Sequence, residues 1–225
     1  APFPGDGDGI RGGKHAGIGR SSASRQGDGD ADTEREDRED KEQAVGLYAQ
    51  VIHGQNTVMS QRRAAYLLYE MDKPEEAIRH LEKFGETHPN YAVDMILAQA
   101  QLMASMKKYD DALAYYDRVI SYQDDREDVI LGKAELLLRM GRLDDAIDLY
   151  SDAVDRWPES PMSLNALGYT LADRTDRHAE AAKLIKKALK LDPDSAAIID
   201  SYGWVLYRQG EYDEALTQLQ RAYEM

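Results

Sequence analysis

Small residues recur along this chain every 34 or 35 positions, and this regularity limits the possible folds more than any other feature of the sequence. Each copy holds two small residues, the second twelve or thirteen positions after the first. The five pairs are Ala65 and Ala77, Ala100 and Ala112, Ala134 and Ala146, Gly168 and Ala181, and Gly203 and Ala215. A period of this length is typical of solenoids, in which each repeat is one supersecondary unit that packs against its neighbours.

Between the small residues, apolar residues recur at spacings of three and four, as they do on one face of an amphipathic helix. Large apolar side chains stand three positions after each first small residue, at Leu68, Met103, Leu137, Leu171 and Leu206. Small residues let two antiparallel helices approach closely, and the large side chains fill the space between one helix pair and the next. We therefore predict an all-α solenoid built from antiparallel helix pairs.

The turns expected between these helices contain residues that end or start helices. Gly141 and Gly210 stand where the first helix of a repeat should end, a common place for glycine. Pro158 and Pro193 follow second helices and introduce the next repeat. Together with the period, these signals place the starts of the repeats near residues 58, 93, 127, 161 and 196.

Two stretches near the C-terminus carry the pattern most clearly, ALGYTLADRTDRHAEAAKLIKKALKLDP and SYGWVLYRQGEYDEALTQLQRAYEM. They resemble the tetratricopeptide-repeat (TPR) family, and the resemblance covers about residues 57–225. It implies a right-handed superhelical solenoid of about five repeats, whose concave groove binds other proteins. The fourth copy departs from the pattern by one extra residue in its turn at 174–178.

The first part of the chain lacks this pattern. Residues 1–38 are rich in Gly, Asp and Ser and poor in large apolar side chains, so we predict a flexible low-complexity tail or linker. Residues 39–56 match the second helix of an incomplete repeat, and we expect an orphan helix there. A calcium loop is an alternative for the tail, because acids stand at four of its ligand positions: Asp28, Asp30, Asp32 and Glu39. Thr33, in place of the glycine that the turn needs, argues against it.

Nothing in the sequence predicts catalysis. There is no cysteine, which excludes disulfides, thiolate nucleophiles and zinc sites built on cysteine. The five histidines do not form a metal-binding pair at i and i+4, and no phosphate-binding loop or hydrolase motif is present. We therefore expect no enzymatic activity, no cofactor and no metal.

Charge and hydropathy narrow the choice of partner. The formal net charge of −14 repels the phosphates of nucleic acids, so we expect no nucleic-acid binding. No run of 18 apolar residues is present, so we expect no direct membrane span. The expected partner is a protein or peptide ligand in the groove. A second copy of the chain is a further candidate, since a solenoid cut at its ends exposes apolar faces.

In the TPR family, fixed positions of each first helix point into the concave groove. The resemblance places the following residues there: Arg62, Tyr66 and Tyr69; Leu131, Glu135 and Arg139; Asn165, Tyr169 and Asp173; and Asp200, Trp204, Tyr207 and Arg208. Aromatic residues and arginines beside a carboxamide suit the recognition of a peptide or helix. The simpler interpretation is that Tyr169 and Trp204 pack against neighbouring helices. The Lys and Asn clamp with which some TPR proteins hold a C-terminal carboxylate is missing.

The strings NALGYTLAD and DSYGWV are similar to those of bacterial outer-membrane TPR lipoproteins. One of these lipoproteins is an adaptor for a periplasmic carboxy-terminal processing protease. The resemblance implies a non-catalytic adaptor or scaffold that delivers substrates to such a protease, in the bacterial periplasm or at the outer membrane. The alternatives are an assembly subunit of a secretion or polysaccharide-export complex, an enzyme whose catalytic domain lies outside this chain, and a cytoplasmic location.

Overall fold

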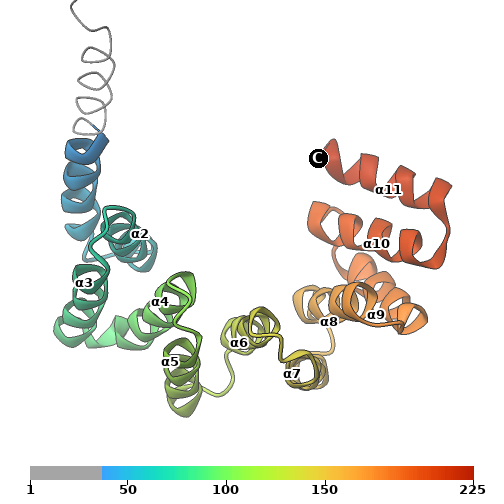
Figure 1. Cartoon of the computed structure of the whole chain (residues 1–225), viewed down its shortest axis with the longest axis horizontal. Coiled ribbons are helices and arrows are strands. Elements are labelled where there is room, and N and C mark those ends of the chain that lie inside the picture. The colour runs from blue at the N-terminus through green and yellow to red at the C-terminus, as the bar shows by residue number, and fades with distance from the viewer. Residues whose placement is uncertain (1–36) are drawn as a thin grey trace, which may run out of the picture.

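The computed structural model describes residues 37–225 (Figure 1). The tail predicted for residues 1–38 and the alternative calcium loop fall almost entirely outside the described residues. The elements from residue 57 onward are α2 (Thr57–Glu70), α3 (Pro74–Thr87), the short 3₁₀ helix η1 (Pro89–Tyr91), α4 (Ala92–Ser105), α5 (Tyr109–Tyr122), α6 (Glu127–Arg139), α7 (Leu143–Arg156), α8 (Pro161–Arg174), α9 (His178–Leu191), α10 (Ala196–Gln209) and α11 (Tyr212–Tyr223).

The predicted all-α solenoid of antiparallel helix pairs is confirmed, and residues 37–225 contain no strand. The first helices of the five repeats are α2, α4, α6, α8 and α10, and each packs against the second helix that follows it. They begin at Thr57, Ala92, Glu127, Pro161 and Ala196, each within one residue of the start expected from the sequence. Figure 1 shows the pairs following an arc, with α4, α6 and α8 toward its inner side and α5 and α7 toward its outer side.

The small residues that define the period lie where helices touch. All five second small residues are buried, at 2% exposure or less: Ala77, Ala112, Ala146, Ala181 and Ala215. The two glycines at first positions permit a still closer approach. A Cβ atom added at Gly168 would lie 2.6 Å from the side chain of Ile185, and one added at Gly203 would lie 2.7 Å from that of Leu219. These helix pairs are therefore closer than any larger residue would allow.

A helix precedes the first repeat. The backbone is helical over residues 37–49, and residues 50–56 connect this segment to α2. The helix expected over 39–56 thus stops short of its predicted end. Gly54, with a φ of 95°, lies in the connection and has a backbone conformation that is incompatible with a continuing helix.

The buried side chain of Gln61 attaches this N-terminal helix to the first repeat. Its amide nitrogen donates to the carbonyl oxygens of Tyr48, 3.3 Å away, and Val51, 2.9 Å away. Because carbonyl oxygens only accept, the amide oxygen of Gln61 is left to accept from Nε2 of His80, at 2.8 Å. Burial lowers the pKa of His80, which favours the neutral ring with its proton on Nε2.

Two arginines connect the first helices of successive repeats. A guanidinium nitrogen of Arg139 donates to the carbonyl of Ala104 at 3.0 Å, and Arg208 donates to the carbonyl of Asp173 at the same distance. Both carbonyls lie in the last turn of the preceding first helix, where the helix dipole is negative. The same contact therefore recurs between repeats two and three and between repeats four and five.

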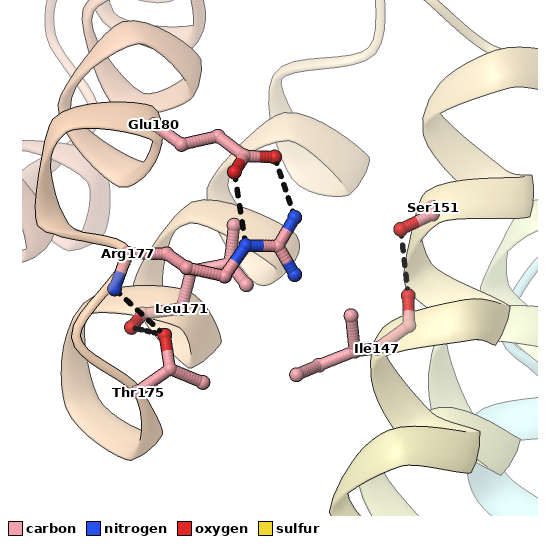
Figure 2. Close-up of polar contacts among 6 residues, drawn as sticks. All are labelled: Ile147, Ser151, Leu171, Thr175, Arg177 and Glu180. Carbon is pink, nitrogen blue, oxygen red and sulfur yellow. Dashed lines mark hydrogen bonds and ion pairs between the residues drawn. The ribbon is translucent and has the colours of Figure 1, made fainter.

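The fourth repeat accommodates its extra residue in the turn between α8 and α9 (Figure 2). The hydroxyl of Thr175 donates to the carbonyl of Leu171 and accepts from the backbone N–H of Arg177, 3.1 Å away. The side chain of Arg177 then forms two hydrogen bonds to Glu180, at 2.8 and 2.9 Å. Side-chain hydrogen bonds thus close this turn, which has no residue in the left-handed region.

Candidate functional site

Three clefts follow one another between the successive first helices. The N-terminal cleft, between α2 and α4, has a volume of about 510 Å³. The middle cleft, between α4 and α6, has about 230 Å³. The C-terminal cleft, between α6, α8 and α10, has about 470 Å³. The N-terminal and the C-terminal cleft are each within the range of about 300–1,000 Å³ that is typical of ligand pockets.

The C-terminal cleft brings together residues from three repeats. Its lining consists of Glu135, Leu138, Arg139, Tyr150, Asn165, Ala166, Tyr169, Thr170, Asp173, Arg174, Ala197, Asp200 and Ser201. Six of these are residues that the sequence assigned to the groove: Glu135, Arg139, Asn165, Tyr169, Asp173 and Asp200. The side chain of Tyr169 is 41% exposed, so its ring is presented at the surface of the cleft.

The C-terminal cleft has an excess of carboxylates. Asp173 pairs with Arg174 at 2.7 Å, and Arg139 is engaged by the carbonyl of Ala104. Within residues 37–225, Glu135 and Asp200 form no ion pair. The pKa of the Tyr169 hydroxyl is raised, first by burial and then by the neighbouring carboxylates of Asp173 and Asp200. The charged groups that act on this hydroxyl are thus three carboxylates, of Asp173, Asp200 and Glu135, and the guanidinium of Arg174.

Glu135 also acts on Tyr150, at the floor of the same cleft. The hydroxyl of Tyr150 lies 3.5 Å from a carboxylate oxygen of Glu135. Burial and the charge of Glu135 together raise the pKa of Tyr150, so this phenol stays protonated and acts as a donor. The hydrogen bond orients the carboxylate of Glu135 without neutralising it.

Two side-chain carboxamides in the clefts have buried oxygens without a hydrogen-bond partner. One is Oδ1 of Asn165, in the C-terminal cleft. The other is Oε1 of Gln101, which lines both the N-terminal and the middle cleft. A buried acceptor without a donor costs about 1–3 kcal/mol, and a ligand that supplies an N–H group would recover this energy if the side chain rotates to expose its oxygen.

The N-terminal cleft differs in character. Its lining consists of Met59, Arg62, Arg63, Ala65, Tyr66, Leu81, Ala98, Gln101, Leu102 and Ser105. The floor of this cleft is apolar. Its lining includes two arginines and no acidic residue, so the cleft is positively charged. The ring of Tyr66 is 41% exposed and the guanidinium of Arg63 lies over it, 5.8 Å from its centroid. Of the groove residues expected in the first repeat, Arg62 and Tyr66 lie here.

Five expected groove residues lie outside these three clefts. Leu131 and Trp204 pack against the core of repeats three to five. Tyr69 packs against the core of the first repeat and donates to the carbonyl of Ser105. Tyr207 stacks on Trp204, and Arg208 lies over the Trp204 ring, 6.0 Å from its centroid. The last repeat thus forms an aromatic cluster at the end of the groove.

The lining residues that the sequence did not assign to the groove include Met59, Arg63, Gln101 and Arg174. Arg63 and Arg174 neighbour expected groove residues in the sequence, and the helix rotation that brings them to the cleft cannot be read from the repeat pattern. Gln101 stands at the same position of its repeat as Tyr66 and Tyr169. That correspondence was the signal that could have identified it.

Across residues 37–225, no group of three or more His, Cys, Asp or Glu side chains is placed to hold a metal ion. In the same part of the chain, none of the helices has the length and apolar character needed to cross a bilayer.

Comparison with known proteins finds the repeat pattern over most of the chain. A family model described as a tetratricopeptide repeat matches residues 62–127 and 131–196, and a second model of the same description matches residues 175–223. The TPR repeat-containing protein PA4667 of Pseudomonas aeruginosa is 34% identical over 190 residues, which make up 84% of this chain. The chain spans about a third of that relative's length, 32%.

Solved structures share the fold at low sequence identity. A thermophilic TPR protein from Thermus thermophilus is 18% identical with a TM-score of 0.59, and the match covers 74% of this chain and 90% of that one. MamA from Desulfovibrio magneticus is 19% identical with a TM-score of 0.54, over 76% of this chain and 95% of that one. YrrB, described as a TPR protein with an unusual peptide-binding site, is 17% identical with a TM-score of 0.50, over 74% and 85% of the two chains.

Proposed function

The chain belongs to the tetratricopeptide-repeat family, whose members mediate protein–protein interactions, and we propose that it is a non-catalytic adaptor or scaffold that binds a protein partner in the C-terminal cleft. The observation that carries this proposal is the combination of an exposed Tyr169 ring with an unpartnered oxygen on Asn165 in one cleft. An aromatic face and an acceptor for a backbone N–H are the two features that a polypeptide ligand uses.

In its more specific form, the proposal is that the partner is a periplasmic processing protease or one of its substrates. Its support is the similarity of the stretch 165–173 and of the stretch 200–205 to bacterial outer-membrane TPR lipoproteins. These stretches lie on α8 and α10, the helices that form the C-terminal cleft. If the partner is such a protease, the protein is located in the periplasm or at the outer membrane. The alternative location is the cytoplasm.

The second candidate is a structural role as an assembly subunit of a secretion or polysaccharide-export complex. The continuous row of clefts along five repeats favours it, because such a surface can hold an extended segment of another subunit. The relative in Pseudomonas aeruginosa is about three times as long as the region that this chain matches.

A capture experiment tests the proposal and separates its two forms. The immobilised chain is incubated with a solubilised cell-envelope extract of the source bacterium, and the retained proteins are identified by mass spectrometry. We expect a protease and cell-wall hydrolases for an adaptor, and export components for an assembly subunit. Replacing Tyr169 with alanine should reduce the retained amount by roughly tenfold or more, as for the removal of an aromatic anchor.

Tyr122→Ala provides the matched control. Tyr122 is a tyrosine with 61% exposure at the end of α5, away from the three clefts, and its loss should leave capture unchanged. Equal capture by the wild type and by Tyr169→Ala would show that the C-terminal cleft is not the binding surface.

A further inference from the structure

We propose that the three clefts act as one charge-polarised groove, which holds a polypeptide segment with its acidic and apolar part in the N-terminal cleft and a lysine or arginine in the C-terminal cleft. This inference rests on the proposed function and specifies the chemistry of its ligand. Its basis is the continuity of the clefts, the opposite charge of their ends and the unpartnered acceptors between them.

The three clefts are continuous because neighbouring clefts share lining residues. Gln101 and Ser105 line both the N-terminal and the middle cleft. Glu135 and Arg139 line both the middle and the C-terminal cleft. A chain that occupies one cleft is therefore led directly into the next. The groove runs along the first helices from α2 to α10.

The N-terminal end of the groove is basic over an apolar floor. Arg62 and Arg63 are exposed, and within the described part of the chain neither forms an ion pair. The floor beneath them includes Leu81 and Leu102, which are buried in the core. Two unpaired arginines are unexpected in a protein with a formal charge of −14. Their charge suits aspartate or glutamate side chains next to an apolar residue that enters the cleft.

The C-terminal end has the opposite charge. The carboxylates of Glu135 and Asp200 face the C-terminal cleft without ion-pair partners in residues 37–225. Of the two arginines of this cleft, Arg174 pairs with Asp173, whereas Arg139 donates to the neutral carbonyl of Ala104 and keeps its charge. The three carboxylates and two guanidinium groups of the lining therefore leave one net negative charge. The ring of Tyr169 supplies a π face beside the carboxylates. This arrangement is suited to a guanidinium or ammonium group.

The unpartnered oxygens of Gln101 and Asn165 are buried, and a rotation of either side chain toward the groove would offer an acceptor to a polypeptide. Both oxygens are acceptors, and a peptide backbone offers a donor at nearly every residue. Packed helices lie about 10 Å apart, so the four intervals between the five first helices separate the two ends of the groove by roughly 40 Å. An extended segment of about twelve residues spans that distance, at about 3.3 Å per residue.

Synthetic peptides with defined charge blocks test the inference. A labelled peptide of about twelve residues carries alternating Asp and Leu in one half and alternating Arg and Ser in the other, and its binding to the full chain is measured by fluorescence anisotropy. We expect the Arg62→Glu, Arg63→Glu double variant to bind it at least tenfold more weakly. A second peptide, in which Lys replaces each Asp, should bind the double variant to within about threefold of the original pair.

Arg79→Glu with Lys83→Glu on α3 is the matched control, since it makes the same change of charge outside the groove and should leave the affinity unchanged. A Kd for the block peptide weaker than about 1 mM, or equal affinity for the Arg62, Arg63 variant, would overturn the inference. If Tyr169→Ala still abolishes capture from the envelope extract in that case, the proposed function stands and only the charge polarity is wrong. If Tyr169→Ala leaves capture intact, the proposed function itself fails.

Discussion

Four of the five repeats close the turn between their two helices with one residue in the left-handed region of the backbone. In the third and fifth repeats this residue is glycine, with φ of 76° at Gly141 and 85° at Gly210. In the first and second repeats it is Asp72 and Lys107, each with a φ of 60°. The hydrogen bond that crosses the turn is the same in each case, as in Lys108 N–H to the Met103 carbonyl at 2.9 Å. The turn thus keeps its left-handed residue in all four repeats, even at Asp72 and Lys107, where a side chain disfavours this conformation.

Replacing Lys107 with glycine should stabilise the protein. A non-glycine residue in this conformation costs about 1–2 kcal/mol, whereas the greater freedom of glycine in the unfolded chain costs about 0.5–1 kcal/mol. The net gain is about 0.5–1 kcal/mol, seen as a higher midpoint of urea unfolding. Gly141→Ala is the converse change and should lower the midpoint by a similar amount. A midpoint for Lys107→Gly at or below that of the wild type would contradict this explanation of the turn.

Single residues also mark the limit of what the sequence predicts about the site. The family positions place Tyr169 and Asn165 on one side of α8, and both line the C-terminal cleft. They do not determine whether a side chain on that side is exposed. Trp204 is such a case, because it lies between Tyr207 and the core, and that outcome depends on how α10 meets its neighbours.

The first helices were predictable as elements because their starts follow from the period and their ends from turn residues. The end of the N-terminal helix could not be predicted in this way. Val51 continues the apolar pattern of Ala44 and Tyr48, and the sequence therefore predicted a helix over residues 39–56. In the structure the helix ends at residue 49, and the buried side chain of Gln61 caps this end by donating to the Tyr48 carbonyl. A hydrogen bond between residues that are ten or more positions apart leaves no local signal in the sequence.

Replacing Gln61 with leucine should release the N-terminal helix from the first repeat. The carbonyls of Tyr48 and Val51 lose their donor and His80 loses its acceptor, at a cost of about 1–3 kcal/mol. Hydrogen–deuterium exchange should then accelerate at the amides of residues 41–52 and remain unchanged from α6 onward. Gln101→Leu is the control, since the amide oxygen of Gln101 has no partner to lose. Unchanged exchange at residues 41–52 in Gln61→Leu would show that the helix is held by other contacts.

The molecule as a whole is a curved solenoid whose inner side carries the row of three clefts. Its core is divided into three clusters along the arc, so each repeat is stabilised mainly by its neighbours. The contacts of Arg139 and Arg208 link neighbouring first helices, and the clefts lie between those helices. The sequence predicts this architecture from its period. The order of charges along the groove emerges only when residues from separate repeats are placed side by side.

The central claim is that a protein partner occupies the inner groove, and photo-crosslinking in cells that produce the protein tests it most directly. A photoreactive phenylalanine analogue takes the place of Tyr169 in one variant and of Tyr122 in another. Since Tyr169 lines the C-terminal cleft and Tyr122 lies outside the clefts, we expect a covalent adduct with a protein partner from the first position and none from the second. An adduct at Tyr122 with none at Tyr169 would contradict the claim.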